Sequence, residues 1–215
     1  MSYKAAVFDL DGTILDTIQD LILAANHTLS INGLPERTPS EIASFVGNGL
    51  AVTISRCIPT GTSAELSSKL CADFMSYYAE HCTEHTVPYE GITEVIRQLK
   101  ESGIKTAVVS NKMDRAVRIL CDEHFPGLFE ITVGERPDVR RKPAPDSLLT
   151  VMKEFGISSA ETVYIGDSEV DIETAANAGI DCINVDWGFR NAAQLKESGA
   201  SVIVSKPADL TELIL

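Results

Sequence analysis

The hydrophobic residues of this chain form short, unbroken runs that are separated by longer amphipathic stretches. Five runs are rich in Val and Ile and do not alternate with polar residues, which is typical of strands covered on both faces. A sixth and weaker run lies near the C-terminus. The six runs are Ala5 to Phe8, Thr106 to Val109, Ile131 to Val133, Val163 to Ile165, Cys182 to Val185 and Ala200 to Val204. They predict the strands of a parallel sheet.

Between these runs, apolar residues recur with the spacing of a helix. Ile92, Val95, Ile96 and Leu99 share one helical face, and Gly103 follows as a C-terminal cap. The alternation of strand and helix predicts an α/β fold, in which a three-layer, Rossmann-like core places helices on both sides of a parallel sheet.

One interval, from about Thr17 to Thr86, contains no strand pattern and several helical stripes. Thr38 to Glu41 has the sequence of a capping box with proline at the first helical position. The apolar stripes on either side of it comprise Ile18, Leu21, Ile22, Ala25 and Leu29, and then Leu66, Leu70, Phe74 and Tyr77 or Tyr78. We therefore expect a helical cap domain at residues 17–86, inserted into an α/β core domain formed by residues 1–16 and 87–215.

The composition of the chain excludes some classes of binding partner. The formal net charge of −13 repels nucleic acid and anionic lipid, and no apolar stretch approaches the length of a membrane span. The N-terminus lacks the pattern of a signal peptide. The five cysteines are scattered without a C-x-x-C pair, which is typical of reduced thiols. We expect a cytoplasmic protein with no nucleic-acid or membrane partner, and its oligomeric state stays open.

Polar residues follow the predicted strands at the ends where ligands bind in open parallel sheets. Asp9 and Asp11 follow the first run. The second run is followed by Ser110, Asn111 and Lys112, and the fourth by Asp167 and Asp171. Lys142 precedes the fourth run. The predicted topology therefore gathers carboxylates, a hydroxyl group and a lysine at one edge of the sheet.

This set of residue types suits phosphate chemistry. Clustered carboxylates are tolerated around a hard cation, and Mg²⁺ prefers one or two carboxylates together with water and phosphate oxygens. Lys142 and Ser110 are suited to binding a phosphoryl group. One carboxylate can attack phosphorus, and a second can protonate the leaving oxygen. Asp9 and Asp11 lie two residues apart in an extended stretch, so both are expected to face the same substrate.

Four segments in order resemble the motifs of the haloacid dehalogenase (HAD) superfamily. They are DLDGT at residues 9–13, VVSNK at 108–112, RKPAPD at 141–146 and GDSEVD at 166–171. The helical insertion after the first motif resembles the first cap type of that superfamily. FVGNGL at 45–50, PYEGI at 88–92 and WGFR at 187–190 are similar to its phosphoglycolate phosphatase-like branch.

The resemblance implies a role for each matching residue. Asp9 would be the nucleophile and Asp11 the general acid and base. Ser110 and Lys142, with the backbone at Asn111, would hold the phosphoryl oxygens.

The resemblance also implies a magnesium site. Mg²⁺ would be bound by the Asp9 carboxylate, the Asp11 carbonyl and the Asp167 carboxylate. Thr13 would orient the first loop, and Asp171 would either support the metal-bound waters or pair with Lys142.

The implied activity is Mg²⁺-dependent hydrolysis of a small phosphate monoester through an aspartyl-phosphate. In dehalogenase and phosphonatase relatives the aspartate matching Asp11 is replaced, so its presence favours phosphate-ester chemistry. Phosphoryl transfer of the β-phosphoglucomutase type and inorganic pyrophosphatase activity are alternatives within the superfamily. A phospho-aspartate receiver-like switch is an alternative outside enzymes, although receivers are shorter and have no insertion after the first strand.

Overall fold

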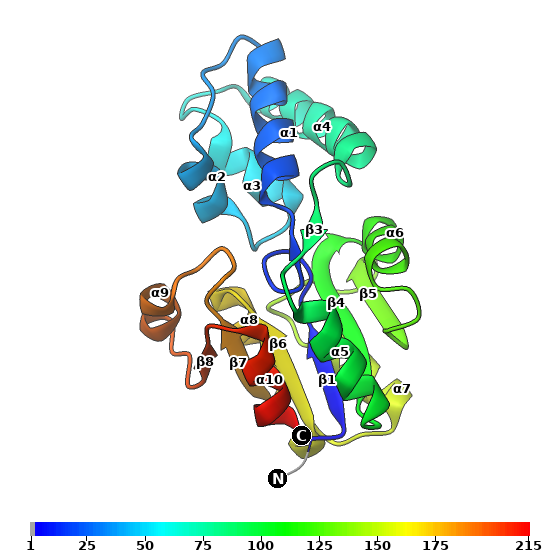
Figure 1. The fold of residues 1–215 in the computed structure, drawn as a ribbon. Helices are drawn as coiled ribbons and strands as arrows, with labels where there is room; N and C mark the ends of the chain where they lie inside the picture. Colours follow the sequence, from blue (N-terminus) through cyan, green and yellow to red (C-terminus); the bar gives the residue numbers. More distant parts are fainter. Residues whose placement is uncertain (1–2) are drawn as a thin grey trace. The chain divides into compact units, whose positions relative to one another are not determined.

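The computed structural model describes residues 3–215 and divides the chain into two compact units. The core unit comprises Met1–Asp16 and Pro88–Leu215, and the helical unit comprises Thr17–Val87 (Figure 1).

The core unit is built on a six-stranded sheet in the order β5-β4-β1-β6-β7-β8. All strand pairs in this sheet are parallel. The strands are β1 (Ala5–Phe8), β4 (Lys105–Met113), β5 (Ile131–Glu135), β6 (Thr162–Gly166), β7 (Asp181–Val185) and β8 (Ile203–Val204). The prediction of a parallel α/β sheet is confirmed, although the last strand is shorter than its apolar run.

The central strand β1 sets the register of the site. Phe8 pairs with Val108 of β4 and with Ile165 of β6, so the residues directly after these three positions lie at the same level. The polar residues that follow these strands are therefore neighbours at one edge of the sheet, although more than 150 positions separate Asp9 from Asp167.

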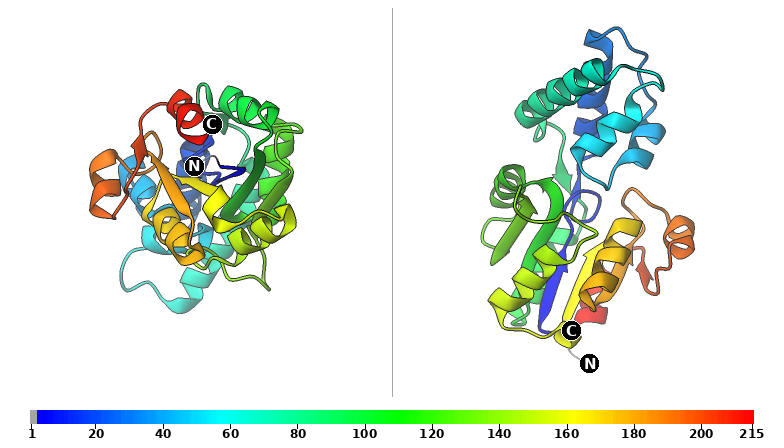
Figure 2. Two further views of the ribbon diagram at one scale, coloured as in Figure 1. Left: turned by 90° about the horizontal axis from the view of Figure 1, so that it is seen from below. Right: turned by 180° about the vertical axis from the view of Figure 1, so that it is seen from behind.

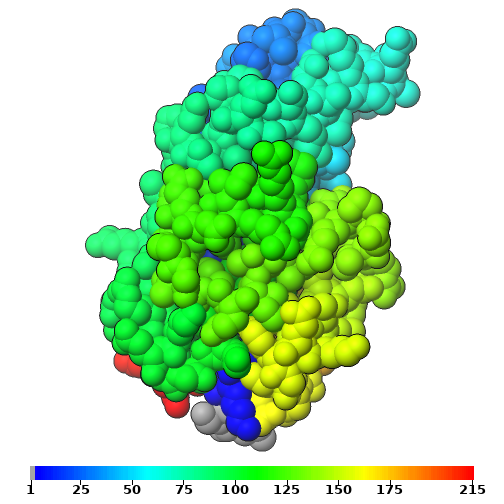
Figure 3. Space-filling view, turned by 90° about the vertical axis from the view of Figure 1, so that its right-hand side faces the viewer, coloured from blue at the N-terminus to red at the C-terminus, as the bar shows by residue number. Residues whose placement is uncertain are grey.

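Helices cover both faces of the sheet (Figure 2). One face packs on α5 (Ile92–Glu101), α6 (Asp114–His124) and α10 (Pro207–Ile214), and the other on α7 (Asp146–Phe155) and α8 (Glu169–Ala178). Every residue of β1 is buried, as expected for a strand covered on both sides. Figure 3 shows a side of the core unit on which the green and yellow segments leave little of the blue β1 visible.

The remaining elements of the core unit are short. Leu15–Asp16 (β2) pairs with Val87–Pro88 (β3), whose first residue belongs to the helical unit, in a separate two-stranded sheet. A 3₁₀ helix (Ser159–Glu161) precedes β6, and α9 (Ala192–Glu197) precedes β8. Within residues 3–215, no helix has the length and apolar character needed to cross a membrane.

The helical unit contains four helices. They are α1 (Ile18–Ile31), α2 (Pro39–Phe45), α3 (Leu50–Cys57) and α4 (Ala64–His81). The Thr38 hydroxyl accepts a hydrogen bond from Glu41 N, and the Glu41 side chain accepts one from Thr38 N, so the predicted capping box is present. Leu70, Phe74 and Tyr78 form the buried stripe of α4.

Candidate active site

The loop after β1 is closed by its own backbone. Asp9 N donates a hydrogen bond of 2.8 Å to Ile165 O, which extends the pairing with β6 by one residue. The carbonyl oxygen of Leu10 then accepts hydrogen bonds from the N–H groups of the three residues 13–15, at 3.2, 3.1 and 3.0 Å. This tight loop holds the first aspartate at the end of the strand.

Gly12 is required in this loop for two reasons. Its φ of +83° lies in the left-handed region, and a Cβ atom there would lie 2.4 Å from Asp167 Oδ2. The sequence predicts only the turn. The structure adds that the glycine lets Asp167 approach the loop.

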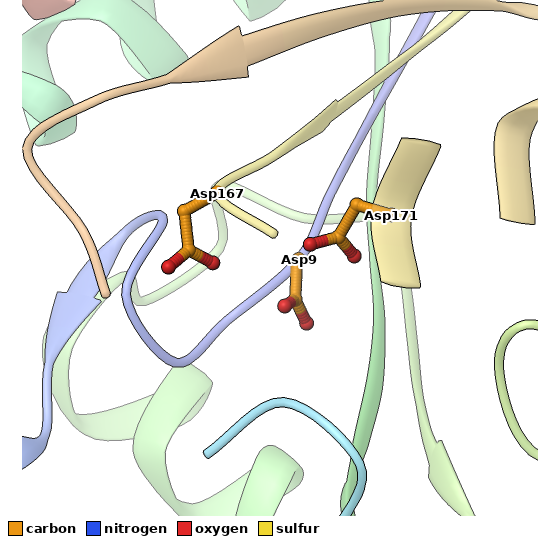
Figure 4. Close-up of side chains that lie close together, drawn as sticks. All are labelled: Asp9, Asp167 and Asp171. Atoms are coloured by element: carbon orange, nitrogen blue, oxygen red, sulfur yellow. The ribbon is translucent and has the colours of Figure 1, made fainter. Parts of the chain in front are cut away.

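Three buried carboxylates converge at the edge of the sheet (Figure 4). Asp9 comes from the end of β1, Asp167 from the loop after β6, and Asp171 from the first turn of α8. One carboxylate oxygen from each lies within 4.8 Å of the others. The structure therefore brings Asp9 and Asp167 together, as the sequence predicts.

Lys142 is the cation inside this cluster. Its side chain is buried, and Nζ lies 2.9 Å from Asp9 Oδ1 and 2.8 Å from Asp171 Oδ1. Nζ also donates a hydrogen bond of 2.9 Å to the hydroxyl oxygen of Tyr164, a residue that the sequence reasoning missed. Of the two roles left open for Asp171, the structure has the pairing with Lys142. The other oxygen of Asp171 accepts hydrogen bonds from Ser168 N and Oγ, so this carboxylate is fully engaged.

Asn111 contacts the backbone of the lysine. Its Nδ2 donates to Lys142 O at 3.1 Å, and its Oδ1 accepts from Lys142 N at 2.9 Å. The side chain of Asn111 thus fixes the position of Lys142. Ser110 is buried beside it, and its Oγ accepts a hydrogen bond of 3.2 Å from Lys112 N.

Asp11 and Thr13 lie on the same loop but have different partners. Asp11 Oδ1 lies 2.8 Å from Nζ of Lys112. Thr13 is buried, and its hydroxyl donates a hydrogen bond of 3.3 Å to Asp167 Oδ1. Thr13 therefore connects the loop after β1 to the Asp167 carboxylate.

A segment near residue 187 also braces the site, which the sequence reasoning missed. Phe189 N donates to Asp167 Oδ2 at 2.7 Å, and the indole Nε1 of Trp187 donates to Thr13 O at 3.1 Å. A Cβ on Gly188 would lie 2.2 Å from Gly12 O. The sequence signal was the WGFR string, but nothing in it indicates contacts across more than 150 positions.

Burial and neighbouring carboxylates make Asp9 and Asp167 hard to ionise. Burial raises the pKa of Asp9 to about 7, with Lys142 opposing that shift and Asp171 adding to it. Burial, followed by the charges of Asp171 and Asp9, holds the pKa of Asp167 well above its usual range. Burial lowers the pKa of Lys142, but Asp171 and Asp9 outweigh it and the net shift is upward.

The residues present fit a divalent cation. Fully ionised, Asp9, Asp11, Asp167 and Asp171 exceed the charge of Lys112 and Lys142 by two. A buried excess of negative charge is costly unless a cation offsets it. Each oxygen of Asp171 accepts two hydrogen bonds, whereas each oxygen of Asp167 accepts one. Asp9 and Asp167 are therefore the carboxylates better suited to bind the ion, through the oxygen ligands that Mg²⁺ prefers.

The fold and the site define an α/β protein with an acidic centre, formed by Asp9, Asp167 and Asp171, at the carboxyl edge of its sheet. The buried Lys142 lies beside this centre. The sequence profile of the haloacid dehalogenase-like hydrolases matches residues 6–185, and the chain belongs to that family.

Named relatives agree with this assignment. The chain is 34% identical to a phosphoglycolate phosphatase of Chromobacterium violaceum, over 98% of this chain and 96% of that protein. It is 31% identical to a phosphoglycolate phosphatase of Pseudomonas savastanoi pv. phaseolicola, over 98% of this chain and 78% of that protein. The solved structure of a proposed phosphoglycolate phosphatase from Lactobacillus delbrueckii subsp. bulgaricus has a TM-score of 0.95 and 40% identity, covering 100% of this chain and 99% of that one. The predicted membership of the phosphoglycolate phosphatase-like branch of the superfamily is confirmed.

Proposed function

We propose that this protein is a Mg²⁺-dependent phosphatase that hydrolyses a small phosphate monoester, with 2-phosphoglycolate as the first substrate to test. The observation that carries the proposal is the convergence of Asp9, Asp167 and Lys142 at the end of β1. The enzyme class, a phosphoric monoester hydrolase, rests on the family and its named relatives. The choice of phosphoglycolate rests on the relatives' names alone.

The first step transfers the phosphoryl group to the protein. A carboxylate oxygen of Asp9 attacks phosphorus, and the bond between phosphorus and the ester oxygen breaks. Asp11 gives a proton to that departing oxygen, which leaves as an alcohol. Lys142 offsets negative charge on the phosphoryl oxygens, and Ser110 donates a hydrogen bond to them. A bound Mg²⁺ would add further positive charge beside these oxygens.

The second step restores the enzyme. Asp11, now a carboxylate, takes a proton from a water molecule that attacks phosphorus. The bond between phosphorus and Asp9 breaks, and inorganic phosphate leaves.

The proposal is tested by measuring phosphate release from a panel of phosphate esters with Mg²⁺ and with EDTA. Asp9→Asn should lower turnover by at least about 10³-fold, because Asn cannot form the acyl phosphate. Asp122→Asn changes an exposed aspartate of α6 and serves as the matched control. Retained turnover in Asp9→Asn, with unaltered circular dichroism, would remove the mechanism.

The same panel separates the alternatives within the superfamily. Isomerisation of β-glucose 1-phosphate without phosphate release would favour the mutase, and hydrolysis confined to pyrophosphate would favour the pyrophosphatase. Stoichiometric labelling of Asp9 without turnover would favour a switch.

A further inference from the structure

Lys112 is a buried lysine that the steps above do not use. It lies in β4, two residues after Ser110, and its side chain is 0% exposed. Its Nζ lies 2.8 Å from Oδ1 of Asp11, whose own side chain is 17% exposed. Burying an ammonium group is costly without a paired and hydrogen-bonded partner. The pair therefore has a specific geometry that the fold maintains.

An irregularity in β4 accompanies this placement. Val109 pairs with Val133 of β5, but the register then shifts before Met113 pairs with Glu135. Within this stretch Lys112 N donates to Ser110 Oγ. A local bulge re-aims the side chains of a strand, and bulges are common beside active sites. The same irregular stretch supplies both Ser110 and Lys112.

The two buried lysines have different partners. Lys142 contacts Asp9 and Asp171, whereas Lys112 contacts Asp11. The nucleophile and the acid are thus each held by a separate cation. Hydrogen bonds within the loop hold the backbone beside Asp11, and the contact of Lys112 Nζ with Oδ1 holds its partly exposed side chain.

We propose that Lys112 is a positioning residue that holds the Asp11 carboxylate through Oδ1 and leaves Oδ2 to exchange a proton with the leaving group. The inference rests on the proposed function, in which Asp11 is the general acid. A charge-assisted hydrogen bond is suited to this role because it is shorter and stronger than a neutral one.

The test is a comparison of leaving groups. A general acid matters for an alkyl phosphate, whose alcohol is a poor leaving group, and little for 4-nitrophenyl phosphate, whose phenolate leaves without a proton. Lys112→Met should lower kcat/KM about 10- to 100-fold for 2-phosphoglycolate or another alkyl phosphate that the wild type hydrolyses. It should lower kcat/KM less than about threefold for 4-nitrophenyl phosphate. Because kcat/KM covers only the steps up to release of the alcohol, the later attack of water does not enter the comparison.

Further variants separate positioning from a structural role. Lys105→Met changes an exposed lysine at the start of the same strand and should leave both substrates unaffected. Lys112→Arg keeps the charge and should restore part of the alkyl phosphatase activity. If Lys112→Met fails to fold, Lys112→Gln keeps a polar donor at the site and should show the same selective loss. Equal losses on both substrates would overturn the inference.

A double-mutant cycle identifies the group through which Lys112 acts. In an Asp11→Asn background, Lys112→Met should cause no further loss on the alkyl phosphate, because the acid is already absent. Additive losses would show that Lys112 acts elsewhere and would overturn the positioning role. Asp11→Asn should itself show the selective loss on the alkyl phosphate. If it lowers both substrates equally, the acid role of Asp11 is wrong and the inference about Lys112 falls with it.

Discussion

Both units bury carboxylates, but the surroundings of Asp20 in the helical unit differ from those of the acidic residues in the core unit. In the helical unit, Asp20 is 3% exposed and is surrounded by donors. It accepts hydrogen bonds from the N–H groups of His85 and Thr86 and from the Thr86 hydroxyl, at 3.0, 3.0 and 2.8 Å. The imidazole of His85 lies 2.9 Å away. In the core unit, Asp9, Asp167 and Asp171 lie close to one another, and Lys142 contacts Asp9 and Asp171. Asp167 accepts one hydrogen bond on each oxygen, from the Thr13 hydroxyl and from Phe189 N, but no cationic side chain contacts it among the described residues.

The comparison teaches how to separate structural acids from functional ones. A buried carboxylate whose oxygens are met by protein donors stabilises its own unit. A buried carboxylate crowded by like charges destabilises its unit until a ligand arrives, and such crowding is typical of a functional site. Burial alone does not distinguish a structural carboxylate from a functional one. The number of neighbouring carboxylates, compared with the number of hydrogen-bond donors and cations, does.

The largest expected effect on stability is the loss of Asp20. Asp20→Asn replaces the charged acceptor of several hydrogen bonds and should cost about 3 kcal/mol of unfolding free energy. Asp9→Asn should instead leave the metal-free protein at least as stable at pH 8, because it removes a charge that burial opposes. Urea unfolding in EDTA, followed by circular dichroism, measures both. A similar loss in the two variants would contradict the distinction.

The next effect is stabilisation of the acidic centre by its ion. Mg²⁺ at about 100 times its dissociation constant should add about 2.7 kcal/mol to the stability of the wild type, because it binds the folded state. Asp167→Asn should abolish this gain, and Asp20→Asn should keep it. Thermal unfolding with and without Mg²⁺ is the measurement. Full Mg²⁺ stabilisation of Asp167→Asn would exclude Asp167 as a ligand.

The difference between the two carboxylate environments also decides what the sequence predicts. The strands are predictable because strands that are covered on both faces, such as Ala5 to Phe8, are unbroken apolar runs that can be read from neighbouring residues alone. Asp9 and Asp167 are predictable because they directly follow such runs at one edge of a parallel sheet. Sequence and topology together thus suffice for the core fold and for the acidic centre.

The partners of these residues are not predictable from local pattern. Asp20 is a buried residue of α1, and its donors come from residues 85 and 86. The Lys112 contact with Asp11 and the Trp187 contact with Thr13 span 101 and 174 positions. Each depends on the tertiary packing, because no spacing rule relates residues so far apart.

A smaller effect is the pH dependence of the metal-free protein. The pKa of Asp9 is raised to about 7 in the folded state, first by burial, so the folded state binds more protons than the unfolded state between about pH 4 and pH 7. This contribution to stability is present at low pH and is lost as the pH rises through about 7. The slope is at most about 1.4 kcal/mol per pH unit for one group.

Comparison with Asp9→Asn isolates this contribution. The free energy of unfolding of the wild type minus that of Asp9→Asn, measured in EDTA, should fall between pH 5 and pH 8. Saturating Mg²⁺ should reduce the fall, because the ion favours the ionised carboxylates. A difference that rises with pH would mean that the surroundings of Asp9 stabilise its charge, and it would contradict this prediction.

The smallest expected effect concerns Trp187, which lies on the segment that donates hydrogen bonds to Thr13 and Asp167. Trp187→Phe removes the indole donor to Thr13 O and should cost about 1 kcal/mol of stability, the value of one neutral hydrogen bond. It should also weaken Mg²⁺ binding a few-fold, because Thr13 donates to Asp167 and outer partners orient metal ligands. Tyr89→Phe, which alters a neighbouring aromatic ring and keeps the indole bond, is the matched control. Mg²⁺ titration by calorimetry would separate the two roles, since a loss of stability with unchanged Mg²⁺ affinity would make Trp187 structural like Asp20.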